Sequence, residues 1–579
     1  MNVRIAFAVA GFFFLASAGG LQGSPADNAS AGRGPAHLAL VKKGKSDFAI
    51  VIDRDASPVV RFAASELQKY IKEISGAELR VTHDAPAGGV ICVGPSATLG
   101  AEMEELGREL RGRGEDGYLI RGAGKRIVLV GNSARATLYA VYRFLEKQLD
   151  CGWCAPGDDT VPQRKTIELA EFSEAVGPPL FAMRQIILFP YGGELLRKNN
   201  LPHTDWLAKN GFNWAHPAPN GPYSWERNKS REIFVPEVKN RGLYLEVGGH
   251  TFNTWLPADK YAKEHPDYYA LTKSGARAAG STHEAGLCIS NPAVVRQVAE
   301  NMIRWLDENP EVDAVDLWHN DSFTFCRCPQ CTPKDAGESG AAAAYTKTYI
   351  HFVNQVADQV ARRHPRILVN LLAYAHTTDC PAGAEPLGEH VLVGLCLFPR
   401  PSQRTMRPLE TSPQRLDTNL RAQIPAWRKL AKHFYIYEYY TFSPNEKVWS
   451  MVSMLHEDVP FLARCRADGI SSDQFGPYWY PLNMYAFGKL MWNPGLRPDE
   501  IIADFCRRYY GRASESMIAY WSLLEEGLRE SWQTERPVDW RDAKRRDCIK
   551  KALSEAENPQ ISARIRAAAA LHKLALDRP

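Results

Sequence analysis

The chain has 579 residues, a length that accommodates about two to four domains. Its 70 basic and 66 acidic residues leave a formal net charge of only +4, so charge gives no reason to expect nucleic acid or an anionic membrane as a partner. An apolar fraction of 45% is enough for large cores.

The first twenty residues have the features of a secretory signal peptide. Arg4 precedes an apolar run over residues 5–15, and small residues follow at 16–18. The run is too short for a membrane anchor, because a spanning helix needs about 20 apolar residues. We therefore expect residues 1–20 to be a signal peptide and the mature protein to be exported, to the periplasm or outside the cell, without a membrane span.

Residues 38–175 have the pattern of a small α/β domain. A helix with a regular apolar period begins at Pro58 and stops at Gly76, and a second helix covers 134–149. The domain contains no cluster of ionisable groups typical of a site. Its predicted strands are 48–52, 90–93, 118–120 and 127–130.

From residue 178 to residue 482, strand-like runs alternate with helices at intervals typical of parallel β/α units. Eight or nine candidate strands indicate a (β/α)8 barrel. From residue 483 to residue 579 the pattern is helical, and the sequence does not decide whether a further domain follows. The principal predicted strands are 181–188, 212–216, 243–250, 314–318, 367–374, 391–398, 434–440 and 469–475.

Three closely spaced cysteines, Cys326, Cys328 and Cys331, follow the predicted strand 314–318. With a fourth thiolate from Cys288 or Cys380 they would suit a structural zinc ion. Disulfides are an equal alternative in an exported protein, and buried free thiols are a third. We expect no catalytic metal, because no histidine or carboxylate stands at a ligand-like spacing with these cysteines, and no cofactor.

Polar and ionisable residues gather where the predicted barrel strands end. The carboxyl ends of barrel strands meet at one rim, and enzymes of this fold build their sites there. Three of the residues are carboxylates, and two carboxylates facing one bond are what glycoside hydrolysis requires. Aromatic residues such as Trp214 and Trp318 crowd the same ends and suit the faces of sugar rings. The polar residues are Arg184, Asn213, His216, His250, Asp321, Tyr374, His376, Glu438 and Asp473.

Several ordered motifs between residues 250 and 511 resemble one known family. They are GGHTF, HPDYYALTKSGAR, LWHNDSFTFCRCPQC, YIYEYY and LMWNPGLRPDEIIADFCRRYYG. They resemble proteins built on domain of unknown function 4838, part of which is classified as glycoside hydrolase family 163. The leading domain, with AASELQKYIKEISGAEL and ATLYAVYRFLEKQLDCGW, resembles the small α/β domain that precedes the barrel in β-hexosaminidases and α-glucuronidases.

This resemblance implies an exported barrel glycosidase that takes a glycan as its substrate. Family 163 implies an endo-β-N-acetylglucosaminidase acting on N-glycans, in which the 2-acetamido group of the substrate supplies the nucleophile. One carboxylate then orients the acetamide and one acid protonates the leaving oxygen. We expect Asp321 and Glu438 to be this pair, Glu438 as the acid, with Asp473 in reserve. The residues expected to contact the sugar are Arg184, His250, Asn320, Tyr440, Trp214 and Trp318.

One departure from the hexosaminidase pattern leaves these roles open. Hexosaminidases carry an adjacent Asp-Glu pair after the fourth barrel strand, whereas this chain has Asn320-Asp321. Two alternatives therefore stay open: another glycosidase, such as an exo-acting enzyme on uronic acids or polysaccharide fragments, and a non-catalytic glycan-binding barrel. Absence of Asp321 or Glu438 from the bowl at the rim would favour the second alternative.

Overall fold

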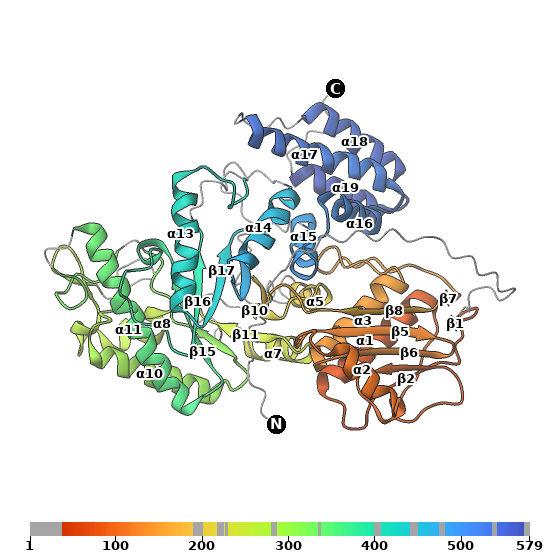
Figure 1. Ribbon diagram of the computed structural model, residues 1–579, viewed down its shortest axis with the longest axis horizontal. Helices are drawn as coiled ribbons and strands as arrows, with labels where there is room; N and C mark the ends of the chain where they lie inside the picture. The colour runs from red at the N-terminus through yellow and green to blue at the C-terminus, as the bar shows by residue number, and fades with distance from the viewer. Residues whose placement is uncertain are drawn as a thin grey trace, which may run out of the picture. The chain divides into compact units, whose positions relative to one another are not determined.

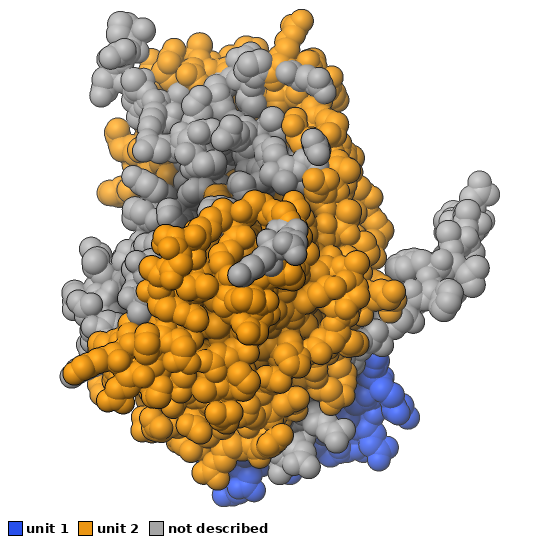
Figure 2. Space-filling view, turned by 90° about the vertical axis from the view of Figure 1, so that its left-hand side faces the viewer, with its two compact units in different colours: residues 1–149, 161–178 blue, residues 150–160, 179–579 orange. Residues whose placement is uncertain are grey.

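The computed structural model describes residues 38–188, 201–216, 225, 230–278, 286–322, 324–333, 337–398, 407–440, 450–473, 481–534, 536 and 541–571. It divides into two compact units, residues 1–149 with 161–178 and residues 150–160 with 179–579, which Figure 2 shows in different colours. The predicted signal peptide, residues 1–20, lies outside the described residues. None of the helices within the described ranges is both long and apolar enough to cross a membrane.

The first unit contains a six-stranded mixed sheet with the order β3-β2-β4-β6-β5-β8. The first four strands are parallel, and β5 runs antiparallel to both of its neighbours. This confirms the predicted small α/β domain. The sheet consists of β2 (Ala49–Val51), β3 (Val81–Thr82), β4 (Val90–Val93), β5 (Tyr118–Ala123), β6 (Arg126–Gly131) and β8 (Phe172–Val176). The other elements are the pair β1 (Leu38–Val41) and β7 (Ile167–Leu169), with α1 (Pro58–Ser75), η1 (Ala97–Leu99), α2 (Glu102–Leu110) and α3 (Ala134–Gln148).

Helix α1 begins and ends where its sequence signals predict. The Ser57 side chain accepts a hydrogen bond from the Val60 amide, and Pro58 occupies the first turn, where a missing N–H costs nothing. Gly76 ends the helix at φ 83°, a left-handed conformation that glycine adopts without a steric penalty. Local side-chain chemistry is therefore enough to define this helix.

The second unit contains a closed barrel of eight parallel strands, as predicted. Each barrel strand falls within or one residue beyond the predicted run, and several are shorter than predicted. Strand β11, for example, ends before Gly248, and β14 ends two residues before Trp318. The strands are β9 (Met183–Ile187), β10 (Trp214–His216), β11 (Tyr244–Val247), β14 (Ala314–Asp316), β15 (Leu368–Ala373), β16 (Val391–Cys396), β17 (His433–Glu438) and β18 (Gly469–Asp473).

Helices and short connecting elements follow the barrel strands. Figure 1 shows α10 and α11 side by side, and α11 contacts β15. The connecting helices are α5 (Leu201–Lys209), α7 (Ser230–Asn240), α8 (Phe252–Trp255), α9 (Ala258–Tyr261), α10 (Pro292–Glu308), α11 (Glu338–Arg363), α13 (Arg415–Leu430) and α14 (Val452–Arg464). The smaller elements are η3 (Pro266–Tyr268), η4 (Ala375–Thr377) and the hairpin of β12 (Ala270–Leu271) with β13 (Arg277–Ala278).

The C-terminal part of the second unit is helical, as predicted. Helices α16, α17, α18 and α19 pack against one another at the C-terminal end of the chain, and α15 contacts α14 and α16 (Figure 1). The elements are α15 (Pro481–Trp492), α16 (Pro498–Tyr510), η5 (Gly511–Ala513), α17 (Ser514–Thr534), α18 (Asp542–Glu555) and α19 (Pro559–Leu571).

Candidate active site

A fully buried polar cluster occupies the interior of the barrel. Asn370 Nδ2, on β15, donates hydrogen bonds to Glu246 Oε1 over 2.6 Å and to Asp316 Oδ1 over 3.0 Å. Gln185 Nε2, on β9, donates to Glu246 Oε2 over 2.5 Å. His216 Nε2 lies 3.1 Å from Asp316 Oδ2, close enough for an ion pair but without the geometry of a hydrogen bond. These contacts join five strands through their inward-facing side chains.

Two glycines make room for this cluster. A Cβ atom on Gly248, which follows β11, would lie 2.2 Å from the Cβ of Asp316. A Cβ atom on Gly394 in β16 would lie 2.5 Å from the hydroxyl oxygen of Tyr435, which lies 3.0 Å from Asn370 Nδ2. Both contacts are closer than real Cβ atoms approach, so the polar side chains reach the barrel interior only because these positions lack a side chain.

Burial keeps this cluster from carrying its full set of charges. Burial, with the nearby charge of Asp316, raises the pKa of Glu246 to about 8. Burial raises the pKa of Asp316 to about 7 and lowers the pKa of His216. Removal from water disfavours each charged form, so near neutral pH the cluster retains at least one carboxyl proton and a neutral imidazole. Gln185 and Asn370 direct N–H groups at three of the four carboxyl oxygens, while Asp316 Oδ2 and both ring nitrogens of His216 have no hydrogen-bond partner among the described residues.

Asp473 ends β18 at the rim, on the inward face of that strand and partly exposed. The hydroxyl of Tyr437, on β17, donates a hydrogen bond to Asp473 Oδ2 over 2.9 Å. Burial raises the pKa of Asp473 to about 6, and burial also raises the pKa of Tyr437 far above its usual range. The tyrosine therefore remains a hydrogen-bond donor, and a substantial part of Asp473 is protonated near pH 6.

Trp318 connects the interior cluster to the rim. Its ring lies edge-on to His216 at 5.9 Å, to Tyr437 at 5.7 Å and to His250 at 5.7 Å between centroids. The side chain is 2% exposed, and its indole Nε1 has no hydrogen-bond partner among the described residues. A buried indole N–H normally has a partner, so this atom is one of the polar groups at the rim that a ligand could satisfy.

The segment after β14 brings Asp321 to the same rim. Asp321 is exposed, and the Tyr374 hydroxyl donates to its Oδ1 over 3.2 Å. The neighbouring His319 backbone carbonyl lies 2.6 Å from His250 Nδ1. Because a carbonyl oxygen can only accept, His250 carries its proton on Nδ1. Asn320 is buried, and a Cβ atom on Gly286 would lie 3.2 Å from its amide group.

Glu438 and Tyr440 lie on the other face of β17. Successive side chains along a strand point to opposite faces. Tyr435 and Tyr437 face the barrel interior, so residues 436, 438 and 440 face outward. Glu438 is 1% exposed, and its Oε2 accepts from the Tyr439 backbone N–H over 3.0 Å. The Tyr440 hydroxyl lies 3.4 Å from Asp458 Oδ2, on α14. Strand parity therefore places Glu438 on the face of β17 opposite to Tyr437, which contacts Asp473.

Arg184 and Trp214 also lie away from the rim. Arg184, whose parity on β9 is opposite to that of Gln185, is fully buried. Its guanidinium donates to the backbone carbonyls of Phe181 and Gly211, each over 2.7 Å. Trp214 begins β10, at the amino end of the strand, and is 1% exposed. The sequence predicts both side chains at the rim, and the structure places neither of them there.

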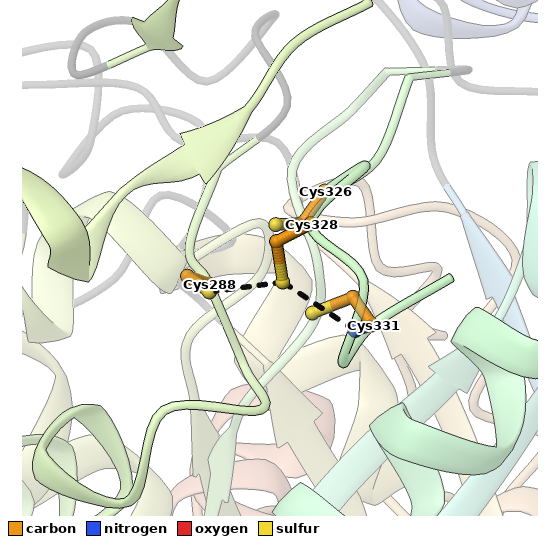
Figure 3. A group of neighbouring side chains, drawn as sticks. All are labelled: Cys288, Cys326, Cys328 and Cys331. Carbon is orange, nitrogen blue, oxygen red and sulfur yellow. Dashed lines mark hydrogen bonds between the residues drawn. The ribbon is translucent and has the colours of Figure 1, made fainter. Parts of the chain in front are cut away.

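The structure selects Cys288, and not Cys380, as the neighbour of the three clustered cysteines. The Sγ atoms of Cys288, Cys326, Cys328 and Cys331 all lie within 4.8 Å of one another, and all four residues are buried (Figure 3). The four are free thiols. Among the described residues it is one of two groups whose ligand atoms lie close enough together to hold a metal ion, and the other is His216, Glu246 and Asp316.

Glu246 and Asp316 were not among the predicted site residues, although a signal for both was present. Each is a carboxylate in the middle of an otherwise apolar strand, in LYLEV and AVDLW. Charged residues are almost never fully buried unless they are paired, so a carboxylate in such a strand indicates an interior polar cluster.

Two family models match the chain. The model described as domain of unknown function DUF4838 matches residues 153–522, and the model of the glycosyl hydrolase family 67 N-terminus matches residues 39–144. A search of the curated proteins finds no match to this sequence.

Similar solved structures are glycoside hydrolases. One is a family GH115 4-O-methyl-α-glucuronidase with specificity for decorated arabinogalactans, at 12% identity and a TM-score of 0.62, covering 93% of this chain and 72% of that chain. Another is a GH138 enzyme targeting pectin rhamnogalacturonan II, at 12% identity and a TM-score of 0.58, covering 90% of this chain and 67% of that chain. At these identities the likeness shows a shared fold.

Proposed function

We propose that this chain, which belongs to the DUF4838 family, is a glycoside hydrolase whose active site is the rim formed by Asp473, Asp321 and Trp318. The observation that carries the proposal is the state of Asp473. It is a partly exposed carboxyl group with a raised pKa of about 6, held by the Tyr437 hydroxyl at the carboxyl end of a barrel strand. A carboxyl group that keeps its proton in this range is suited to protonate a leaving glycosidic oxygen.

Asp321 supplies the second carboxylate in this proposal. It follows the fourth barrel strand, whereas Asp473 ends the eighth, and the carboxyl ends of parallel barrel strands share one rim. Ring contacts support a common rim, because Trp318 packs against Tyr437, the donor to Asp473, and against His250, which packs against Tyr374, the donor to Asp321. Two carboxyl groups on one rim are the minimum for glycoside hydrolysis.

The substrate proposed from the family resemblance is a glycan with a 2-acetamido sugar, cut by an endo-β-N-acetylglucosaminidase reaction. The acetamide oxygen forms a bond to the anomeric carbon while the glycosidic bond breaks and Asp473 transfers its proton to the leaving oxygen. Asp321 accepts the acetamide N–H hydrogen bond. Water then attacks the anomeric carbon, opens the cyclic intermediate and returns a proton to Asp473, which restores the enzyme and releases the sugar.

This assignment exchanges the roles expected for Glu438 and Asp473. Glu438 belongs to the outward face of β17 and binds the backbone of its own strand, whereas Asp473 faces inward. The absence of Glu438 from the inward face favours the non-catalytic alternative only if no other acid replaces it. Asp473 meets the requirements of that acid.

A uronic-acid glycosidase is the second candidate, because the N-terminal residues match a family 67 model and one similar structure is a 4-O-methyl-α-glucuronidase. The deciding experiment incubates the purified mature chain with a complex N-glycoprotein and with uronic-acid-containing oligosaccharides, and identifies products by mass. Release of a glycan that leaves one N-acetylglucosamine on the protein supports the first substrate. Release of a uronic acid alone supports the second, and binding without release supports a glycan-binding barrel.

Matched variants test the role of each carboxylate in the same assay. Asp473→Asn and Asp321→Asn should lose hydrolysis with the fold intact, whereas the exposed Asp358→Asn on α11 should match the wild type. Glu438→Gln tests the earlier expectation directly. Full activity in Asp473→Asn together with loss in Glu438→Gln would return the acid role to Glu438.

Export is also part of the proposal. It rests on the signal-peptide pattern of residues 1–20. Intact-mass analysis of the protein from the periplasmic or secreted fraction of a bacterial host should show removal of about the first 20 residues. A full-length chain confined to the cytoplasm would contradict it.

A further inference from the structure

Four cysteines from two distant segments meet at a buried point beside the rim. Cys288 precedes α10, and Cys326, Cys328 and Cys331 lie on the segment that follows β14 and Asp321. Their side chains point toward a common centre (Figure 3), and the residues are between 0% and 5% exposed. Cysteine side chains are the softest ligands in the chain, and four of them at one point form a complete ligand set for a soft metal.

The distances match a tetrahedral ion better than disulfide bonds. A tetrahedral zinc ion with Zn–S bonds of about 2.3 Å separates its sulfur ligands by about 3.8 Å. Cys288 Sγ and Cys328 Sγ are 3.6 Å apart, and all four sulfurs lie within 4.8 Å of one another. A disulfide would bring two sulfurs to about 2.05 Å of each other. Here each sulfur instead has the other three within 4.8 Å.

Backbone amides and a serine hydroxyl surround the sulfurs and can orient them as metal ligands. The Leu271 amide of β12 donates to Cys326 Sγ over 3.3 Å, and the Cys331 amide donates to Cys328 Sγ over 3.4 Å. Ser290 Oγ lies 3.2 Å from Cys331 Sγ and 3.5 Å from Cys328 Sγ. Hydrogen bonds of this kind orient metal ligands and stabilise their charge.

We propose that Cys288, Cys326, Cys328 and Cys331 form a structural zinc site that fastens the segment after β14 to the segment before α10. Four protein ligands close the coordination sphere, so the ion has no open position for substrate and its role is structural. Binding converts the thiols to thiolates and releases their protons to solvent, with no change in oxidation state. The site holds the segment that leads away from Asp321, but its existence does not depend on the proposed glycosidase activity.

The first test measures zinc in the purified, untagged full chain by plasma mass spectrometry. We expect one zinc ion per chain in the wild type, loss of zinc in Cys288→Ser and Cys328→Ser, and retention in Cys380→Ser, the matched control outside the cluster. The chain is prepared both from the cytosol and after export. Absence of zinc after reduction and reloading with zinc would overturn the proposal, as would retention in both cluster variants.

A second measurement uses only the wild-type chain, so it holds even where the variants do not fold. The zinc-free protein is loaded with Co²⁺, which is expected to give the absorption of a tetrahedral cobalt–thiolate centre and to lose it when Zn²⁺ is added. Removing the metal with a chelator should lower the thermal unfolding midpoint, and zinc should restore it. An intact mass that shows two disulfides among these four cysteines in the exported chain would overturn the zinc site.

Discussion

The Tyr437 hydroxyl donates a 2.9 Å hydrogen bond to Asp473 Oδ2 across the neighbouring strands β17 and β18. Burial and this hydrogen bond act on the pKa of Asp473 in opposite senses. Burial raises it to about 6, while the hydrogen bond from Tyr437 opposes that rise because it stabilises the carboxylate. This balance determines the pH range in which Asp473 is an acid, and the first two predictions follow from it.

Hydrolysis by the wild type should decline as the pH rises above about 6, because Asp473 then loses the proton that it transfers to the leaving oxygen. Asp473→Asn removes the proton altogether and should lower kcat/KM by roughly 10²–10⁴-fold on a substrate with a poor leaving group. A pH–rate profile on a glycan and on an activated aryl glycoside measures both effects. The activated substrate should lose less, since its leaving group needs less protonation. Equal losses on both substrates would argue against the acid role.

Tyr437→Phe should move the alkaline limb of the same profile to higher pH. Removal of the hydroxyl takes away a hydrogen bond that stabilises the charged carboxylate, so the pKa of Asp473 increases and its proton is retained longer. The control is Tyr261→Phe on α9, whose hydroxyl contacts Asn301 outside the barrel interior. A limb that stays in place, or moves to lower pH, would show that the hydrogen bond does not govern the titrating group.

The interior cluster should make the protein less stable as the pH rises. The folded-state pKa of Glu246 is about 8, above an unfolded value of about 4.3, so the folded state holds an extra proton between these values. That stabilisation is complete below about pH 4 and is lost as the pH approaches 8, with a slope of at most about 1.4 kcal/mol per pH unit. Glu246→Gln, which is neutral throughout, should flatten the dependence of the unfolding midpoint on pH.

The exposed Glu300→Gln on α10 serves as the control for this effect and should keep the wild-type slope. Calorimetric scans of the wild type and both variants from pH 5 to pH 8 measure it. A Glu246→Gln variant with an undiminished slope would place the buried proton on another group, of which Asp316, with a pKa of about 7, is the first to test.

Gly248→Ala should destabilise the barrel. Its new Cβ atom would lie 2.2 Å from the Cβ of Asp316, and both atoms are close to rigid backbone, so one strand must shift. Overpacking of this kind costs about 1–3 kcal/mol. Gly388→Ala is the control, because its Cβ atom would meet only ordinary contacts at 3.7 Å and beyond. Urea unfolding of both variants checks the difference, and equal stabilities would show that the strands yield without cost.

Local sequence signals were sufficient for α1, α3 and the order of the barrel strands, whereas α2 and β8 were not predicted. Ser57, Pro58 and Gly76 specify the ends of α1 through hydrogen bonds and backbone preferences that involve only nearby residues. The apolar runs of the eight barrel strands are likewise visible in the sequence, because strands buried on both faces need continuous apolar residues. Fold class and strand positions could therefore be predicted without any long-range contact.

Only the tertiary structure decided which side chains meet. Glu438 and Asp473 both end a strand, but a shift of one residue reverses the face of a strand, and the register of β17 turns Glu438 outward while Tyr437 reaches Asp473. The choice of Cys288 over Cys380 depends in the same way on where two distant segments pass each other. Sequence alone determined the barrel and its polar rim. The assembled fold determined which side chains face that rim and which distant segments lie next to each other, and so determined the chemistry there.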